Sequence, residues 1–311
     1  MSEFKNIMIF VSDALNYNYI PDSIAEEGSG PIKTLAPSLH SPQSFTSLLT
    51  GFESPNHEVD DFFEFEAGTK TVFDLFPNTT FYDHKDSAIG RIFGQPIEEL
   101  EDIEEPFIWV ERAMETHEPY GVMEHGNELP REYLEGREYF SSMEQDEIIE
   151  EYENACDKME EHFWRHIQTL KNRGIYENTL VIFTSDHGEI MGENIWGKKR
   201  FGHNNPPTKH VAQVPTVFLN SEIMSEYMRT VDILPTALSM LEKGYYTMDG
   251  VNIKEETVDK GICQTTLRFF KLQWTWNGED WQLKNPYKGL IEDLMIRTPL
   301  SNLVAWLRRF R

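Results

Sequence analysis

Two short apolar segments, each followed by an aspartate, constrain the fold of this chain more than any other feature of its sequence. Residues 7–11 read Ile-Met-Ile-Phe-Val and precede Asp13, and residues 179–184 read Thr-Leu-Val-Ile-Phe-Thr and precede Asp186. Short runs of this kind, continuously apolar and rich in β-branched side chains, are typical of parallel strands that are covered on both faces. Because ligand sites form at the carboxyl ends of such strands, we expect Asp13 and Asp186 to share one site.

Further segments complete an α/β pattern. Residues 107–110 and 214–219 are predicted strands, and residues 144–173 are predicted to form the longest helix, because apolar side chains recur there every three or four positions. Gly174 follows that helix at the position expected for a C-terminal glycine cap. A shorter helix is predicted at 231–241. Strands that alternate with helices predict an α/β fold with a mainly parallel sheet sandwiched by helices.

The pattern changes after Asp249-Gly250. Residues 266–276 and 279–283 flank Asn277-Gly278, a dipeptide that is typical of a tight β-hairpin turn. We therefore predict three units, which are a main α/β domain at residues 1–245, a small antiparallel subdomain at 246–285, and a C-terminal helix or tail at 286–311.

The C-terminal tail combines apolar side chains with a basic end at Arg308, Arg309 and Arg311. We expect it to form a helix that packs on its own domain, because cations at a helix C-terminus are favourable. The alternative is that this tail contacts a membrane surface or a partner peripherally.

The charge excludes one class of function. The chain has 53 acidic and 28 basic residues, for a net charge of -25, so we do not expect binding to nucleic acid, which relies on neutralising phosphates. The acidity leads to the hypothesis of a halophilic protein, because concentrated salt screens self-repulsion. The 2 cysteines provide no disulfide scaffold. No segment has the ~20 apolar residues of a transmembrane helix, and the N-terminus does not resemble a signal peptide, so a cytoplasmic location is expected.

Two segments carry chemistry. Residues 185–189, Ser-Asp-His-Gly-Glu, follow the second strand directly, and a carboxylate oxygen and an imidazole nitrogen at a strand end can bind one metal ion. Residues 36–51 are rich in hydroxyl groups and lead into a helix, whose N-terminus stabilises anions. Taken alone, the first is weak evidence for a metal, and the second is better explained by an ordinary Ser/Thr helix cap.

Taken together, these segments resemble the sulfatase family of the sulfatase/alkaline-phosphatase superfamily. Residues 6–16 end in Val-Ser-Asp-Ala-Leu-Asn and are similar to the opening strand of that family, which carries a metal-binding aspartate. Residues 36–51 resemble its nucleophile segment and end in Ser-Leu-Leu-Thr-Gly. Residues 115–120 resemble its His-x-Pro-Tyr loop, residues 178–189 its most recognisable run, and residues 231–236 the start of a late helix.

The resemblance covers residues 5–285 in the family's order, and implies an alkaline-phosphatase-like fold and a metal-dependent hydrolase of sulfate or phosphate esters. The metal ligands that it implies, around one divalent ion (Ca, Mn, Mg or Zn), are Asp13, Ser41, Asp186 and His187. The catalytic residues that it implies are Ser41 as nucleophile, His117 at the substrate or leaving group, Lys198 on the transferred anion, and His210 as an acid or base. His203 is a further candidate ligand or acid/base group. For Lys198 and both later histidines, an ordinary place in a surface loop is the alternative.

This chain departs from the family pattern in several places. Sulfatases of the main type carry a formylglycine made from the first residue of Cys/Ser-x-Pro-x-Arg, whereas residues 41–45 here read Ser-Pro-Gln-Ser-Phe. The cysteine is absent, the proline is shifted and Phe45 replaces the arginine, so formylglycine is not expected. Ser12 replaces the first aspartate of an Asp-Asp pair, and Asn16 stands where an arginine usually follows. Loss of the two arginines, at the positions of Phe45 and Asn16, is expected to weaken anion binding.

Three functions therefore remain open, all with an anionic small-molecule or glycan partner. The first is a hydrolase with Ser41 as direct nucleophile, similar to the phosphatases and phosphotransferases of the superfamily. The second is a sulfatase-type activity on a sulfated sugar or aryl ester. The third is a degenerate, non-catalytic member that binds an anionic glycan or acts as a scaffold.

Overall fold

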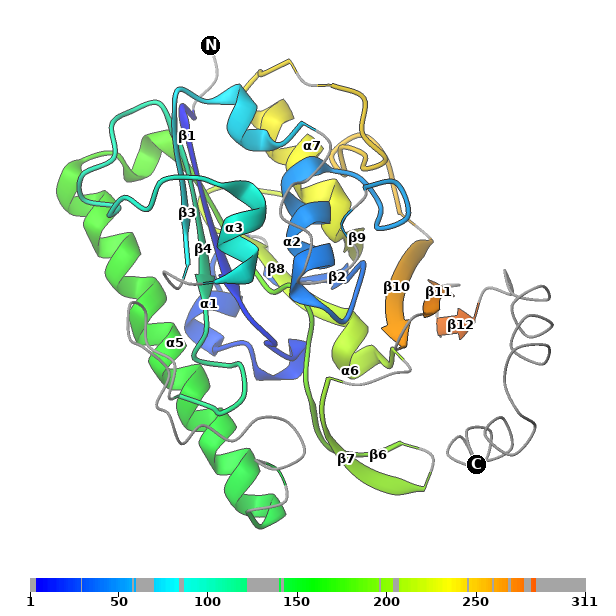
Figure 1. Ribbon diagram of the computed structural model, residues 1–311. Helices are drawn as coiled ribbons and strands as arrows, with labels where there is room; N and C mark the ends of the chain where they lie inside the picture. Colours follow the sequence, from blue (N-terminus) through cyan, green and yellow to red (C-terminus); the bar gives the residue numbers. More distant parts are fainter. Residues whose placement is uncertain are drawn as a thin grey trace.

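A seven-stranded sheet with the order β3-β4-β1-β5-β8-β2-β9 lies at the centre of the computed structural model (Figure 1). The residues that the structure describes are 4–28, 30–57, 59, 70–83, 87–121, 140, 143–195, 197–203, 207–244, 246–258, 260–267, 270–276 and 281–283. The sheet is built from β1 (Asn6–Ser12), β2 (Ile32–Leu35), β3 (Asn78–Tyr82), β4 (Phe107–Ala113), β5 (Thr179–Thr184), β8 (Gln213–Phe218) and β9 (Tyr227–Arg229).

Four neighbouring strands, β3, β4, β1 and β5, are parallel to one another. β2 and β9 are also parallel, but β8 is antiparallel to both of its neighbours, β5 and β2. The predicted strand at 214–219 is thus present, shifted by one residue. The sheet is mainly parallel, as expected, with one antiparallel strand inserted.

Helices cover both faces of the sheet. α5 (Gln145–Arg173) lies along one face, and α2 (Ser41–Thr50), α3 (Ala88–Phe93) and α7 (Thr230–Met240) lie on the other (Figure 1). The shorter helical segments are α1 (Asp22–Ala25), α6 (Lys209–Ala212) and the 3-10 turns Tyr17–Tyr19, Val72–Leu75 and Tyr176–Asn178. α5 confirms the longest predicted helix. It begins with a capping box between Glu144 and Glu147 and ends at Gly174, whose φ is 70°.

The alternating side chains of β1 supply two separate hydrophobic cores. Ile7, Ile9 and Val11 pack on the face that α2 and α7 cover, whereas Met8 and Phe10 pack on the face that α5 covers. Since successive side chains of a strand point to opposite faces, a strand with both faces buried must be apolar throughout. This confirms the interpretation of residues 7–11.

The smaller sheets differ in part from the prediction. The predicted single strand at 266–276 is wrong, because the chain instead reverses inside it. The last two residues of β10 (Gly261–Leu267) fall in that range, and β10 pairs antiparallel with β11 (Phe270–Trp276), which pairs with β12 (Trp281–Leu283). β6 (Ile190–Ile195) and β7 (Lys198–Gly202) form another antiparallel pair that was not predicted.

Several expectations stay predictions. The Asn277-Gly278 turn and the tail at 286–311 lie outside the described residues, and the domain boundary at 245 is not tested. Within the described part of the chain, we find no helix long and apolar enough to cross a membrane.

A buried polar network joins the end of α2 to α7 and to the segment after it. Oε1 of Glu53 lies 3.1 Å from Nη1 of Arg229, and the Glu53 N–H donates to Oδ2 of Asp249 at 2.9 Å. Nη2 of Arg229 also lies 2.7 Å from Oδ1 of Asp232. Burial, helped by the charges of Asp232 and Asp249 and opposed by Arg229, raises the pKa of Glu53 to about 7.

This shift predicts a pH dependence of stability. Between the unfolded and folded pKa values the folded chain holds a proton on Glu53 that the unfolded chain releases, so stability falls as the pH rises from ~4.5 to ~7. A shift of this size corresponds to roughly 3 kcal/mol. Glu53→Gln is expected to remove that part of the decline, measured by denaturant unfolding across this pH range. Glu222→Gln, at an exposed position, is the control, and equal slopes for Glu53→Gln and wild type would contradict the prediction.

Candidate functional site

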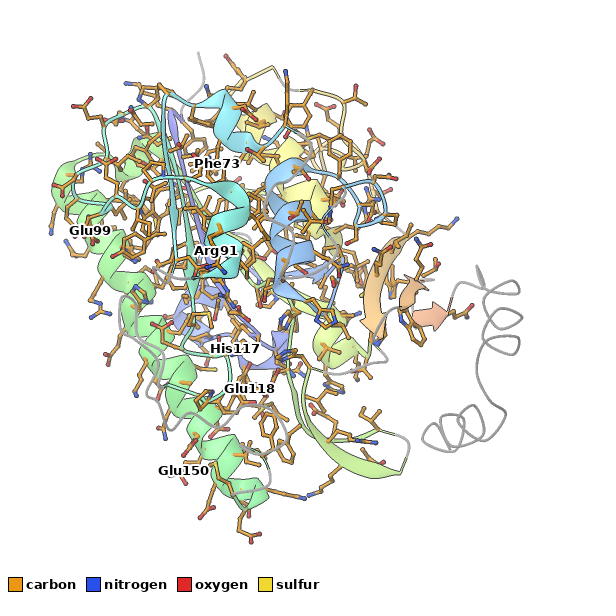
Figure 2. All side chains as sticks on the ribbon, in the orientation of Figure 1. Phe73, Arg91, Glu99, His117, Glu118 and Glu150 are labelled. Carbon is orange, nitrogen blue, oxygen red and sulfur yellow. The ribbon has the colours of Figure 1, made fainter. Side chains whose placement is uncertain are left out.

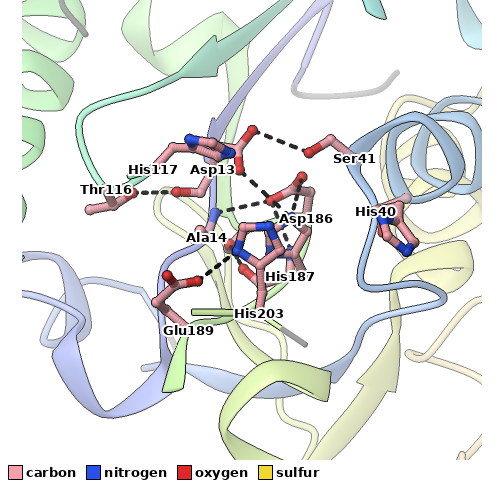
Figure 3. A network of polar contacts seen from close by, with 12 residues as sticks. Asp13, Ala14, His40, Ser41, Thr116, His117, Asp186, His187, Glu189 and His203 are labelled. Carbon is pink, nitrogen blue, oxygen red and sulfur yellow. Dashed lines mark hydrogen bonds and ion pairs between the residues drawn. The ribbon is translucent and has the colours of Figure 1, made fainter. Parts of the chain in front are cut away.

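Asp13, Asp186 and His187 meet at the carboxyl ends of two neighbouring parallel strands. Asp13 follows β1, and Asp186 and His187 follow β5, as Figure 3 shows. One ligand atom from each residue lies within 4.8 Å of the others, and all three residues are buried. The structure therefore brings together the two aspartates that the strand ends predicted, with the histidine between them.

The orientation of these side chains suits a cation. Oδ1 of Asp186 accepts hydrogen bonds from the N–H groups of Ala14 at 3.2 Å and His187 at 2.8 Å. Within the described residues, Oδ2 of Asp186 and Oδ1 of Asp13 are buried without a hydrogen bond, and Nε2 of His187 lies 3.6 and 3.7 Å from them. Two carboxylate oxygens and one imidazole nitrogen that face the same point fit the donor preference of a divalent metal ion.

The pKa shifts of the three residues also fit a metal site. Burial and the neighbouring charge of Asp13 raise the pKa of Asp186 to about 7. Burial opposes ionisation of Asp13 too, but Arg112 and nearby imidazoles hold the pKa of Asp13 below its usual range. Burial also keeps the pKa of His187 well below its usual value. The ring of His187 is therefore neutral, which is the form that can bind a metal.

Ser41 lies beside this cluster at the first position of α2. Its Oγ donates to Oδ2 of Asp13 at 3.3 Å (Figure 3). Pro42 follows in the first turn, where its missing N–H costs no helical hydrogen bond. α2 is buried along its whole length and ends at Gly51, whose φ of 72° is left-handed. The serine therefore stands on a rigid element whose N-terminal dipole favours an anion.

Arg112 is a site residue that the sequence analysis missed. Its Nε and Nη2 lie 2.7 and 2.6 Å from Oδ2 of Asp13, and its Nη1 lies 3.6 Å from Oδ1 of Asp83. Arg112 stands on β4 next to Val11 of β1. The available signal was a charged residue near the end of a strand that is otherwise apolar at 107–110.

Arg112 also changes the interpretation of the missing arginines. Asn16 donates from Nδ2 to the carbonyl oxygen of Glu189 at 2.6 Å and so supports the site loop. Phe45 is fully buried and packs edge-to-face on Phe81, with ring centroids 5.5 Å apart. Neither residue supplies a charge, but the chain provides a cation from a different strand.

Two further histidines lie at the site. His117 and Glu118 belong to the loop that follows β4, toward the lower end of the sheet in Figure 2. Nδ1 of His117 contacts the carbonyl oxygen of Glu118 at 2.7 Å, and burial lowers the pKa of His117. The ring of His203 lies 5.6 Å from that of His117 and 4.4 Å from that of His187, centroid to centroid.

His203 is held by a buried carboxylate. Its Nδ1 lies 2.8 Å from Oε2 of Glu189, whose Oε1 accepts a hydrogen bond from the Tyr120 hydroxyl at 2.8 Å. Burial opposes the charged ring, but the Glu189 carboxylate outweighs it and raises the pKa of His203 to about 9. The structure thus places His203 beside the cluster. This position agrees with a role at the site rather than with an ordinary surface loop.

His210 and Lys198 are the remaining residues for which the sequence predicted a catalytic role. Nδ1 of His210 lies 2.9 Å from Oε1 of Glu193, which belongs to β6. Lys198 is the first residue of β7, but its side chain lies outside what the structure describes. The catalytic roles of both residues therefore stay predictions.

Comparison with known proteins places this geometry in context. A curated relative, the low-salt glycan biosynthesis sulfotransferase Agl7 of Haloferax volcanii, is 29% identical over 281 residues. The match covers 83% of this chain and 66% of that protein, so the chain spans slightly less than two thirds of this relative's length.

Solved structures show the same fold. A phosphonate monoester hydrolase of Agrobacterium radiobacter superposes with a TM-score of 0.65 at 13% identity, covering 98% of this chain and 94% of the other. A 2-O GAG sulfatase superposes with a TM-score of 0.63 at 12% identity, covering 99% and 92%. These likenesses confirm the predicted α/β, alkaline-phosphatase-like architecture.

The family follows from a match that covers most of the chain. The sulfatase family model matches residues 37–243, a range that contains Ser41, Asp186 and His187. Asp13, which directly follows β1, completes the cluster, and the chain belongs to the sulfatase family.

Proposed function

We propose that this chain is a metal-dependent hydrolase of sulfate or phosphate esters, with the hydroxyl of Ser41 as its nucleophile. The observation that carries the proposal is the position of Ser41, whose Oγ lies 3.3 Å from Asp13 at the edge of a buried donor cluster. A divalent ion held by Asp13, Asp186 and His187 would favour ionisation of the hydroxyl and neutralise the substrate anion. Calcium, manganese, magnesium and zinc all suit these ligands.

The residues of the chain account for the atoms and protons of the reaction. Oγ of Ser41 forms a bond to the sulfur or phosphorus, while the bond from that atom to the leaving oxygen breaks. Since Nδ1 of His117 donates to the Glu118 carbonyl, the lone pair of the neutral ring is on Nε2. Nε2 accepts the serine proton, directly or through one water, and passes it to the leaving oxygen. Water then hydrolyses the serine ester.

Direct use of serine is favoured over formylglycine. The segment 41–45 has no cysteine, and Phe45, at the arginine position of the formylglycine pattern, belongs to the hydrophobic core. An unmodified Ser41 at the N-terminus of α2 already has the dipole and the neighbouring carboxylates that the reaction requires. The complete donor cluster also argues against a degenerate, non-catalytic member of the family.

The curated relative favours a second candidate function. Agl7 is named as a sulfotransferase of glycan biosynthesis, and the same serine ester can be resolved by an alcohol in place of water. In that case this chain would transfer the group to a glycan hydroxyl. Hydrolysis and transfer share every step up to the attack on the serine ester, so an anionic glycan ester is the proposed substrate class for both.

The nucleophile is tested by Ser41→Ala. Turnover of p-nitrophenyl phosphate or p-nitrophenyl sulfate, assayed with each of the four metals, is expected to fall by about 10³-fold or more, since the covalent step is lost. Ser47→Ala is the matched control, because Ser47 lies on the same buried helix and contacts Nε2 of His57 at 3.0 Å instead. Unchanged turnover in Ser41→Ala would exclude Ser41 as nucleophile.

The same assay separates the two candidate functions. With a sugar alcohol added in excess, a hydrolase releases inorganic sulfate or phosphate in step with p-nitrophenol, whereas a transferase releases less anion than p-nitrophenol. Both products are quantified in the same reaction.

Arg112 is tested by its effect on stability. Arg112→Met leaves the charge of Asp13 buried without its strongest partner, so the free energy of unfolding is expected to fall by about 3–5 kcal/mol. Arg112→Lys keeps the charge but cannot present the two donors that reach Oδ2 of Asp13, and should lose less. Denaturant unfolding without added metal measures both. Equal stability of Arg112→Met and wild type would contradict the assigned ion pair.

A further inference from the structure

A second cluster of metal-binding side chains lies on the face of the sheet that α5 covers. Glu111 projects from β4 and is fully buried, and His162 and His166 project from α5 with 9% and 15% of their side chains exposed. A spacing of four residues puts these histidines on the same side of the helix, one turn apart. One ligand atom from each of the three residues lies within 4.8 Å of the others.

This cluster is separate from the candidate active site. Glu111 directly precedes Arg112, and neighbouring side chains of a strand point to opposite faces of the sheet. Arg112 contacts Asp13 on one face, whereas Glu111 contacts the histidines of α5 on the other. The sheet itself therefore lies between the two clusters.

The atoms of this second cluster are already spaced like the ligands of one ion. Oε2 of Glu111 lies 2.8 Å from Nε2 of His166, and Oε1 of Glu111 lies 3.2 Å from Nε2 of His162. The two Nε2 atoms are 3.1 Å apart. In a tetrahedral zinc site, metal–nitrogen distances of ~2.0–2.1 Å place neighbouring ligand atoms roughly 3.3 Å apart. Little movement is needed to place an ion among these atoms.

Glu115 determines which nitrogen of His162 faces the cluster. Its Oε1 lies 2.7 Å from Nδ1 of His162, and an ionised carboxylate only accepts hydrogen bonds, so Nδ1 carries a hydrogen. In the neutral ring the lone pair is then on Nε2, which faces Oε1 of Glu111. Two acceptors in contact repel each other, so this contact needs a positive group between them. Burial disfavours a second proton on the ring, but Glu111 and Glu115 outweigh burial and raise the pKa of His162 to about 10. The contact is therefore held by a proton on Nε2 or by a metal ion that takes its place. A carboxylate that orients a metal-binding histidine through its other nitrogen is the common arrangement in metal proteins.

The surroundings suit a metal ion of intermediate softness. The ring of Trp109 lies 4.9 Å from that of His166, and the ring of Phe10 lies 5.4 Å from that of His162. These aromatic side chains shield the site from solvent, which strengthens ligation. Two imidazoles and one carboxylate are ligands typical of zinc, and the partly exposed His166 allows a solvent molecule as fourth ligand.

We propose that Glu111, His162 and His166 bind a Zn²⁺ ion, with Glu115 orienting His162. The ion links α5 to β4 and so stabilises the strand that carries Arg112 and leads into the loop of His117. Its role is structural, and the proposal does not depend on the nucleophile being Ser41.

The test separates the two clusters by mutation. The protein is dialysed against a chelator and titrated with Zn²⁺, and bound metal is measured by elemental analysis. The variant Asp186→Asn/His187→Gln, which lacks donors of the active-site cluster, is expected to keep one zinc equivalent. Adding His166→Gln to that variant should remove this equivalent, and adding Glu115→Gln should weaken its affinity about 10-fold to 100-fold. Gln168→Ala, an exposed change on α5, should leave zinc binding unaffected.

A spectroscopic measurement tests the proposal even if the variants with His166→Gln or Glu115→Gln do not fold. Co²⁺ bound to Asp186→Asn/His187→Gln should show the intense visible absorption of a tetrahedral site with nitrogen ligands. Absence of Zn²⁺ and Co²⁺ binding in that variant would overturn the proposal, as would binding that His166→Gln leaves unchanged. The cluster would then be an ion-pair network in which a protonated His162 bridges Glu111 and Glu115.

Discussion

Two carboxylates buried side by side are the constraint on which the rest of this structure depends. Asp13 and Asp186 are both withdrawn from solvent at the carboxyl edge of the sheet, and removal of a charge from water costs several kcal/mol unless a partner compensates. The charge of Arg112 compensates Oδ2 of Asp13, and two backbone N–H groups donate hydrogen bonds to Oδ1 of Asp186. The remaining oxygens face His187, and this arrangement is favourable when a cation lies among them.

The local backbone is shaped to permit this burial. Gly188 follows Asp186 and His187, and a Cβ atom there would lie 2.2 Å from the carbonyl oxygen of His210. Only glycine allows the turn to approach α6 this closely. The hydrogen bond from the Gly188 N–H to the Val211 carbonyl oxygen at 2.9 Å holds the two segments together. Close packing around the turn thus keeps Asp186 and His187 in one orientation.

β4 connects the two faces of the molecule. In a sheet covered on both sides, each charged side chain is in the interior whichever way it points, so it requires a partner there. Arg112 finds this partner in Asp13, and Glu111 finds it in the histidines of α5. Two adjacent charged residues therefore anchor β4 to the strand on one side and to the helix on the other, and the loop with His117 starts from this fixed point.

The sequence alone determined the features that rest on local patterns. Continuous apolar runs identified β1 and β5, and helical periodicity identified α5. The aspartates within two residues of the two strand ends identified the shared site. These features are readable because each depends on neighbours within one segment. The prediction of a single strand at 266–276 was wrong, because the chain reverses between β10 and β11 without an Asn-Gly signal. That reversal depends on how β10, β11 and β12 pair.

Only the tertiary structure decided which distant side chains complete the sites. Arg112 and Asp13 are 99 positions apart, and the parallel register of β1 and β4 brings them together. Glu111 meets His162 and His166 because the pleat turns it toward α5 and the helix presents two successive turns to it. A sequence shows that such residues are polar, but not which face they point to or what lies opposite. That depends on strand register and helix packing, which form only when the whole sheet is assembled.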